Sequence, residues 1–222
     1  MKNIETIISM KKMFFLLMLL LSMMRLLAQN TLQTYSDVGI RYNIVSGLSN
    51  FDSYMSSDAS YTKSYVPTFG VNYSKGLAIG TFSCQLDLAV NMGIGDFSDS
   101  QYKKKEDFLS TVRINYAIFR NSEWSIEPSI GLGLAYSTLY FATSRGAPAW
   151  NDSYSSTHMT LPLTLSVWNT RFKHPLGIFI QYMVNLGQSG STTRTGLGSV
   201  VFDNLHIFPS TFSIGTQWRL AH

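Results

Sequence analysis

Charged side chains are few along this chain, and five of them fall inside segments where apolar and polar residues alternate. They are Arg41, Asp87, Arg113, Glu127 and Arg219. An unpaired charge is costly in a protein interior, so we expect these groups to form ion pairs or to hold water. Such a cluster can serve as a gate or a proton path, or it can fill an interior and fix the register of neighbouring strands. We favour the second role.

Within this lumen charge cluster, Arg113 and Glu127 are expected to meet. They lie on consecutive segments on either side of a short turn, Arg120–Glu123, and on the same face. Asp87 lies on the segment that precedes Arg113.

Nucleophilic catalysis would require a serine beside a histidine base. His158 lies near Ser155 and Ser156, and His206 lies near Asp203. With 4 histidines and many serines in the chain, such neighbours arise by chance. The histidines do not show metal-ligand spacing, and no Gly-rich phosphate loop is present. The sequence therefore predicts a protein that is not an enzyme, with no catalytic residue, cofactor or metal.

The segment Thr81–Ile94 alternates strictly between apolar residues and polar or small ones. This period of two is typical of a β-strand whose faces meet different surroundings. The segment is longer than an ordinary globular strand of about 5–6 residues. It is long enough to cross a membrane, for which a tilted strand needs about 9–11 residues.

The same alternation recurs along the chain and predicts an all-β protein with eight strands. The expected strands are Asp37–Val45, Lys63–Ser74, Thr81–Ile94, Asp107–Phe119, Trp124–Tyr140, His158–Trp168, Leu176–Gly187 and Leu205–Leu220. Between Asp37 and Leu220, no continuous apolar run suggests a transmembrane helix.

The connections between these segments alternate between long and short. The long ones are Ser46–Thr62, Gly95–Glu106, Phe141–Thr157 and Gln188–Asp203, and the short ones are Lys75-Gly76, Arg120–Glu123 and Asn169–Pro175. Short periplasmic turns and longer extracellular loops are typical of outer-membrane barrels. The long loops carry aromatic residues that are candidates for partner contact or for packing on the barrel rim: Tyr54, Tyr61, Tyr102, Trp150 and Tyr154.

The polar faces of the segments consist mainly of Gly, Ser, Thr, Ala, Asn and Gln. A soluble barrel of the lipocalin type faces water outside and would carry many Lys and Glu there. Small residues with few charges suit a cramped interior instead. Aromatic residues near the short turns are expected to form an outward girdle at the membrane interface: Tyr73, Phe82, Trp124, Trp168 and Trp218.

The first 28 residues resemble a secretory signal peptide. Lys11 and Lys12 precede the apolar run 13–24, and a small-residue site follows, with cleavage expected after Ala28. Either Met1 or Met10 could be the start. Residues 1–28 hold four of the 17 Lys and Arg and one of the 13 Asp and Glu, so the rest is close to neutral. This balance predicts no nucleic-acid partner.

The leader ending LLAQ, the eight alternating segments and the late aromatic segment FPSTFSIGTQWRL resemble a small outer-membrane β-barrel protein. The plan is similar to that of the OmpA transmembrane domain and OmpX, and to β-barrel families of the Bacteroidota type. One departure is the end Leu220-Ala221-His222, where many such barrels have an aromatic residue.

This resemblance implies an eight-stranded antiparallel up-and-down transmembrane β-barrel over residues 29–222, in the outer membrane of a Gram-negative cell. Its implied partners are outer-membrane lipid and a protein that contacts the extracellular loops. It implies a role in envelope integrity or partner contact. The alternatives are an accessory barrel of a secretion or transport assembly, and an outer-membrane lipid-modifying enzyme.

Overall fold

The computed structural model describes residues 32–45, 67–98, 101–142, 152–188, 192–195, 200–202 and 210–221. The expected leader, residues 1–28, with its cleavage after Ala28, lies outside these residues. No helix in the described part of the chain is long and apolar enough to cross a membrane.

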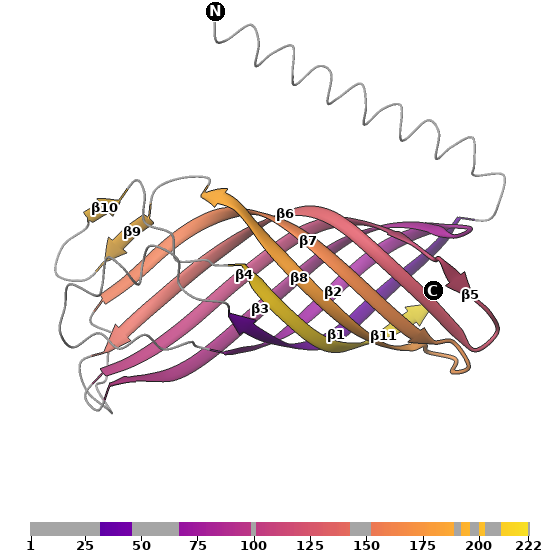
Figure 1. The fold of residues 1–222 in the computed structure, drawn as a ribbon, viewed down its shortest axis with the longest axis horizontal. Coiled ribbons are helices and arrows are strands. Elements are labelled where there is room, and N and C mark those ends of the chain that lie inside the picture. Colours follow the sequence, from indigo (N-terminus) through magenta and orange to yellow (C-terminus); the bar gives the residue numbers. More distant parts are fainter. Residues whose placement is uncertain are drawn as a thin grey trace, which may run out of the picture.

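Long β-strands dominate the described structure and close into a ring. The long strands are β1 (Gln33–Val45), β2 (Thr68–Ile79), β3 (Phe82–Ser98), β4 (Gln101–Tyr116), β6 (Trp124–Ala142), β7 (Asp152–Asn169), β8 (Leu176–Gln188) and β11 (Thr211–Ala221). The short strands are β5 (Phe119–Arg120), β9 (Thr192–Thr195) and β10 (Val200–Phe202). Each long strand pairs antiparallel with the next, and β11 pairs with β1. The predicted all-β, eight-stranded antiparallel barrel is confirmed (Figure 1).

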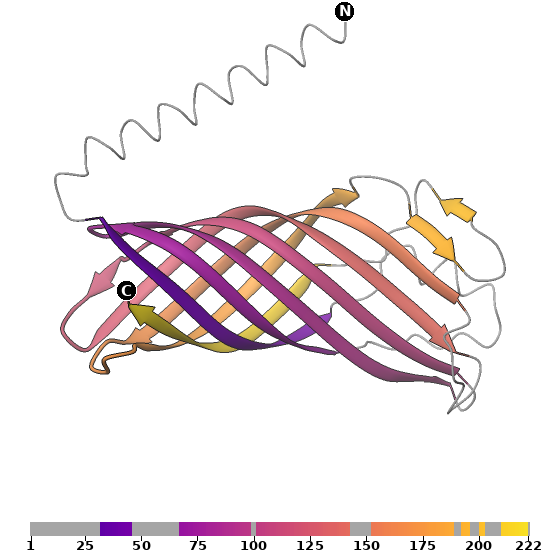
Figure 2. The same ribbon diagram turned by 180° about the vertical axis from the view of Figure 1, so that it is seen from behind.

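The first and last long strands lie side by side at one end of the barrel. Tyr35, near the start of β1, is level with Ala221 at the end of β11. The β2–β3 turn and the connection between β8 and its predecessor β7 are at this same end, which we call the near end (Figures 1 and 2). The other end, the far end, carries the β9–β10 hairpin (Figure 1).

The predicted facing of the strands is confirmed, because side chains alternate between an exposed outer face and a buried lumen. Leu132 on β6 is 58% exposed, whereas Ala135 on the same strand is fully buried at 0%. On β3, Leu86 points outward and Asn91 points into the lumen at 2% exposure. Exposed large apolar side chains occur on all of the long strands. The barrel is therefore apolar outside and largely polar inside.

The predicted turn at Lys75-Gly76 is wrong. Both residues lie inside β2, and the turn is at Gly80 and Thr81, where Gly80 has a φ of 59°. A positive φ suits glycine because it has no side chain to clash with the backbone. The glycine at position 76 has a different reason. An added Cβ there would lie 2.3 Å from Cζ of Tyr35. The glycine makes room for a neighbouring ring within the strand.

The predicted long loop Gly95–Glu106 is also wrong. Strands β3 and β4 continue toward the far end to Ser98 and Gln101, with a bulge between Asp96 and Ser98. The lysine-rich segment is part of β4, and its charged side chains therefore alternate between the outer face and the lumen. Lys104 pairs with Glu106 at 2.5 Å on the outer side, and Lys105 pairs with Asp107 at 3.4 Å on the lumen side.

Several other boundaries differ from the expected ones by a few residues. Strand β1 begins at Gln33, and β7 begins at Asp152 within the expected third loop. The described part of the last strand begins at Thr211, since residues 203–209 lie outside the described residues. Hydrogen-bonded pairing with a neighbour extended these strands past the points where hydrophobic alternation ends.

Candidate functional site

The lumen holds almost all of the buried charge in the described structure, and it is organised in layers along the barrel. The predicted lumen residues Arg41, Asp87, Arg113 and Glu127 are buried there, and Arg219 is half-buried. The lumen charge cluster therefore lies on the predicted face, although its pairings differ from those expected.

The layer at the near end is centred on Arg219. Its guanidinium donates from Nε to Oδ1 of Asp37 at 3.0 Å and from Nη2 to Oε2 of Glu127 at 3.3 Å. Asp37 is the direct cross-strand partner of Arg219 on β1. Glu127 lies on β6, which is separated from β11 by β7 and β8 around the ring. The contact with Glu127 therefore crosses the lumen.

Two aromatic rings and a rim arginine complete this layer. Cζ of Arg219 lies 4.2 Å from the ring centroid of Tyr35 and 4.0 Å from that of Trp168. These cation–π contacts are strongest where water is excluded, as it is around the buried Trp168. Arg120, at the exposed rim, approaches Glu127 at 3.5 Å. The side chains at the near end are thus held together by ion pairs, hydrogen bonds and cation–π contacts.

The middle layer is centred on Asp87, which binds Arg113. Nη2 of Arg113 donates to Oδ1 of Asp87 at 3.0 Å, and Nε donates to the other carboxylate oxygen. Two-point contacts of this kind fix both planes and are the stronger form of an arginine–carboxylate pair. Gln85 donates to Oδ1 at 2.6 Å and Thr111 to Oδ2 at 3.2 Å. The carboxylate is thus fully occupied by neighbours on β3 and β4.

The predicted pairing of Arg113 with Glu127 is wrong, and the strand register explains why. Arg113 on β4 is level with Gly131 on β6, so Glu127 lies four residues nearer the barrel end. Proximity to the same turn is not enough, because the β4–β6 connection contains the extra short strand β5. Each residue pairs with a partner at its own level instead.

A third polar layer lies nearer the far end and was missed from the sequence. Lys105 and Asp107 are 2% and 4% exposed, and Ser137 donates to Oδ1 of Asp107 at 2.7 Å. The signal was available: Asp107 has the same parity along its strand as Thr111 and Arg113. The three lysines before Asp107 made this segment resemble a loop, so the parity of Asp107 was not followed.

Apolar side chains also point inward and occupy the space between the middle layer and the third polar layer. Ala89, Leu109, Ala135 and Met183 form one buried cluster, which we call the apolar layer. Phe179 and Trp168 are buried as well, at 5% and 1% exposure. Trp168 packs over Gly177, where an added Cβ would lie 2.7 Å from its Cε3 atom. The lumen is filled by side chains along much of its length.

Four of the predicted girdle residues point outward, and the fifth, Trp168, does not. Tyr73, Phe82, Trp124 and Trp218 are outward and exposed. Trp168 points inward because it shares the parity of Thr164 and Ser166, which line the lumen. Tyr73 is not level with Phe82: Phe82 pairs with Ile79, six residues further along β2.

The loop aromatics lie partly beyond what the structure describes. Tyr54, Tyr61 and Trp150 are outside the described residues. Tyr102 is in β4 and Tyr154 is in β7, so neither is a loop residue. Tyr154 is 3% exposed, and the guanidinium of Arg194 on β9 lies 5.8 Å from its ring centroid. The contact ties the β9–β10 hairpin to the barrel.

The structure brings together one serine–histidine pair that the sequence singled out. Oγ of Ser156 and Nε2 of His158 are 2.5 Å apart on β7. Both side chains are buried in the lumen, at 2% and 0% exposure, away from the outer wall. No group of His, Cys, Asp and Glu that could hold a metal occurs among the described residues. His206 and Asp203 lie outside them.

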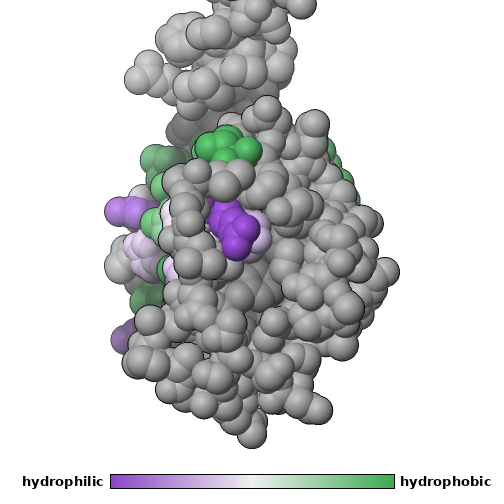
Figure 3. Space-filling view, turned by 90° about the vertical axis from the view of Figure 1, so that its left-hand side faces the viewer, coloured by the Kyte–Doolittle hydropathy of each residue, from purple (hydrophilic) through white to green (hydrophobic). Residues whose placement is uncertain are grey.

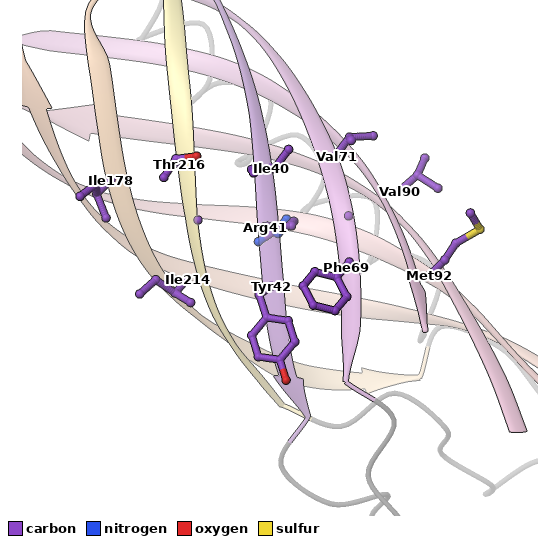
Figure 4. A pocket seen from close by; sticks show the side chains of 12 residues that line it. Ile40, Arg41, Tyr42, Phe69, Val71, Val90, Met92, Ile178, Ile214 and Thr216 are labelled. Carbon is purple, nitrogen blue, oxygen red and sulfur yellow. The ribbon is translucent and has the colours of Figure 1, made fainter. Parts of the chain in front are cut away.

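A wide apolar groove lies on the outer wall over β8, β11, β1, β2 and β3. Its volume is about 730 Å³. Ile40, Phe69, Val71, Ile178 and Ile214 project from these strands around it (Figure 4). The groove is part of the continuous apolar outer face.

Comparison with protein-family models finds no match, and comparison with curated proteins finds none either. Several solved structures are similar in fold. Neisserial surface protein A is 12% identical, with 85% of this chain and 97% of that chain covered and a TM-score of 0.49. Ail, the attachment invasion locus protein of Yersinia pestis, is 12% identical, with 85% and 98% covered and a TM-score of 0.47.

A major outer membrane protein from Thermus thermophilus is 9% identical, with 83% of this chain and 99% of that chain covered and a TM-score of 0.47. These identities and scores are too low to transfer a function. The function has to be inferred from the geometry of this chain.

The Asp87–Arg113 pair gives a direct test of the lumen geometry. Asp87→Ala should lower the free energy of unfolding in lipid by about 3–5 kcal/mol, because it leaves a buried guanidinium without its carboxylate. Combined with Arg113→Ala, it should cost less than the sum of the two single changes, measured by urea unfolding.

The matched control combines Arg113→Ala with Glu127→Ala. These residues do not meet, so their effects should add to within about 0.5 kcal/mol. Coupling between Arg113 and Glu127, with additivity between Arg113 and Asp87, would contradict the observed pairing.

Proposed function

We propose that this protein is an outer-membrane barrel that is not an enzyme, with a lumen closed by its own side chains. The observation that carries the proposal is the inverted facing of the strands. Exposed apolar side chains cover the outside on every long strand, while buried polar and charged groups fill the inside. Water outside would favour the opposite arrangement. Hydrocarbon outside accounts for it, and a closed ring of strands leaves no unpaired backbone edge there.

The near end is then the periplasmic end and the far end faces the exterior. Short turns at the periplasmic side are typical of such barrels, and the outward Trp124 and Trp218 lie on strands close to that end. The expected cleaved leader is consistent with export.

The working surface in this proposal is the far end, used for partner contact or for envelope integrity. Strands β3, β4, β6 and β7 extend further there than β2, whose pairing with β3 stops at Met92. Strand β9 pairs with the end of β7, and β10 pairs with β9. A raised sheet therefore stands on one side of the far end. The described residues visible there include both hydrophilic and hydrophobic side chains (Figure 3).

An accessory barrel of a secretion or transport assembly is the second candidate, because a raised sheet also suits a stable subunit contact. A lipid-modifying enzyme has less support. Its best dyad, Ser156 and His158, is buried in the lumen, whereas a lipid would approach from the outer wall.

The outer face is tested by Leu132→Arg. An arginine at the middle of a lipid-facing strand should lower the free energy of unfolding by about 2–4 kcal/mol in lipid vesicles. Leu132→Phe is the control, since it keeps the position apolar and should change stability little. Equal stability of the two variants would show that this face does not meet hydrocarbon.

The closed lumen is tested by planar-bilayer recording of the intact protein. The interior of an eight-stranded barrel is only wide enough for side chains to fill it. We expect no large, stable conductance. A steady porin-like conductance would replace the proposed contact role with diffusion of solutes.

The far end is tested by replacing Thr192–Phe202, which includes the β9–β10 hairpin, with a short flexible linker. The ring of long strands does not include this hairpin, so folding into lipid should be kept. Cross-linked partners recovered from native outer membranes with the intact protein should be lost. Unchanged recovery would place partner contact elsewhere; no recovery with either protein would favour the envelope role.

A further inference from the structure

A small internal cavity lies in the lumen between the middle layer and the apolar layer. Its volume is about 20 Å³. Its polar lining comes from Arg41, Asn72, Asp87, Thr111 and Gln181, all of which are less than 9% exposed. Ala89, Leu109 and Met183 of the apolar layer close the other side. The cavity is lined by buried side chains of the lumen, and apart from Arg41 its lining residues differ from those of the groove on the outer wall.

Arg41 differs from the other arginines of the lumen, because no carboxylate lies within ion-pair distance of it among the described residues. It donates from Nη2 to Oε1 of Gln181, and its Cζ lies 5.7 Å from the ring centroid of Phe179. Its Nε is buried and has no hydrogen-bond partner among the described residues. A guanidinium keeps its charge and its N–H donors under all ordinary conditions. A buried donor of this kind requires an acceptor.

Asn72 supplies the complementary group. Its Oδ1 is buried and also lacks a partner within the described part of the chain. Asn72 is level with Gly39 on β1, two residues from Arg41 on the same face. The two side chains are therefore diagonal neighbours, a spacing at which long side chains come close. Both residues line the cavity, yet Nε of Arg41 and Oδ1 of Asn72 do not bind each other.

The charges around the cavity select a neutral occupant. Asp87 lines the cavity and would repel an anion, while Arg41 would repel a cation. The buried lumen charges are also balanced, with Arg41, Lys105, Arg113 and Arg219 against Asp37, Asp87, Asp107 and Glu127. The described lumen as a whole therefore carries no net formal charge, and a neutral occupant keeps that balance.

The cavity volume matches one water molecule, which needs at least about 10–15 Å³. We propose that the cavity is a hydration site for a single water. The water accepts a hydrogen bond from Nε of Arg41 and donates one to Oδ1 of Asn72. Because the apolar layer closes one side, this water exchanges slowly with bulk solvent. The site goes beyond the proposed function and does not depend on the far end or on any partner.

The site can be tested by NMR on the full chain folded in lipid nanodiscs. Dipolar cross-peaks to water are expected at the Hε of Arg41 and at the side-chain amide of Asn72. Ala89→Val should fill the cavity and remove both cross-peaks. Ala135→Val is the matched control: Ala135 belongs to the same apolar layer but does not line the cavity, so the cross-peaks should remain. Absence of the cross-peaks in the unmodified protein, or their persistence in folded Ala89→Val, would overturn the proposal.

A crystal structure of the unmodified protein grown with sodium bromide decides the matter even if Ala89→Val does not fold. One solvent peak within hydrogen-bond distance of Arg41 Nε and Asn72 Oδ1, without anomalous signal, is the expected result. An anomalous bromide peak there would make the site an anion site. An empty cavity would also overturn the proposal.

Discussion

Closure of the sheet is the constraint on which the rest of this structure depends. In the proposed membrane location, backbone N–H and C=O groups that face hydrocarbon find no water to bind, so each must pair within the protein. The pairing of β1 with β11 satisfies the last two edges. Once the ring is closed, hydrocarbon surroundings leave the alternation of side chains one consistent solution, with apolar groups outward and polar groups inward, and this is the facing observed. Length, facing and lumen composition all follow from that condition.

Charged side chains are then packed in the narrow space of the lumen. Ion pairs form the polar layers, and an apolar layer lies between two of them. Asp37, Glu127 and Arg219 form one layer, Asp87 and Arg113 another, and Lys105 with Asp107 a third. Glycines such as Gly76 and Gly177 lie beside the rings of Tyr35 and Trp168 and leave space for them. The filling is therefore a property of the register between strands as much as of composition.

The sequence predicted what depends on parity and failed where register decides. Strand number, strand facing and the membership of Arg41, Asp87, Arg113 and Glu127 in the lumen follow from alternation along single strands. The partner of Arg113 does not, because it depends on how far β4 slides along β3 and β6. The girdle prediction for Trp168 is wrong because it rests on nearness to a turn, whereas parity along the strand decides the facing. Lys105 lies in a strand and not in the predicted loop Gly95–Glu106, because β4 continues through the three adjacent lysines.

The bond between Asp37 and Arg219 has a consequence for how the molecule is built. The two residues are 182 positions apart in the chain, yet they are direct neighbours across the β1–β11 seam. A contact so distant in sequence carries a higher loop-closure cost than a hairpin contact, and topologies rich in such contacts fold slowly. Until the last strand arrives, the carboxylates of Asp37 and Glu127 face an unfinished interior without their shared cation. The seam thus couples completion of the chain to neutralisation of the interior, and a barrel lacking its final strand is penalised electrostatically as well as by its open edges.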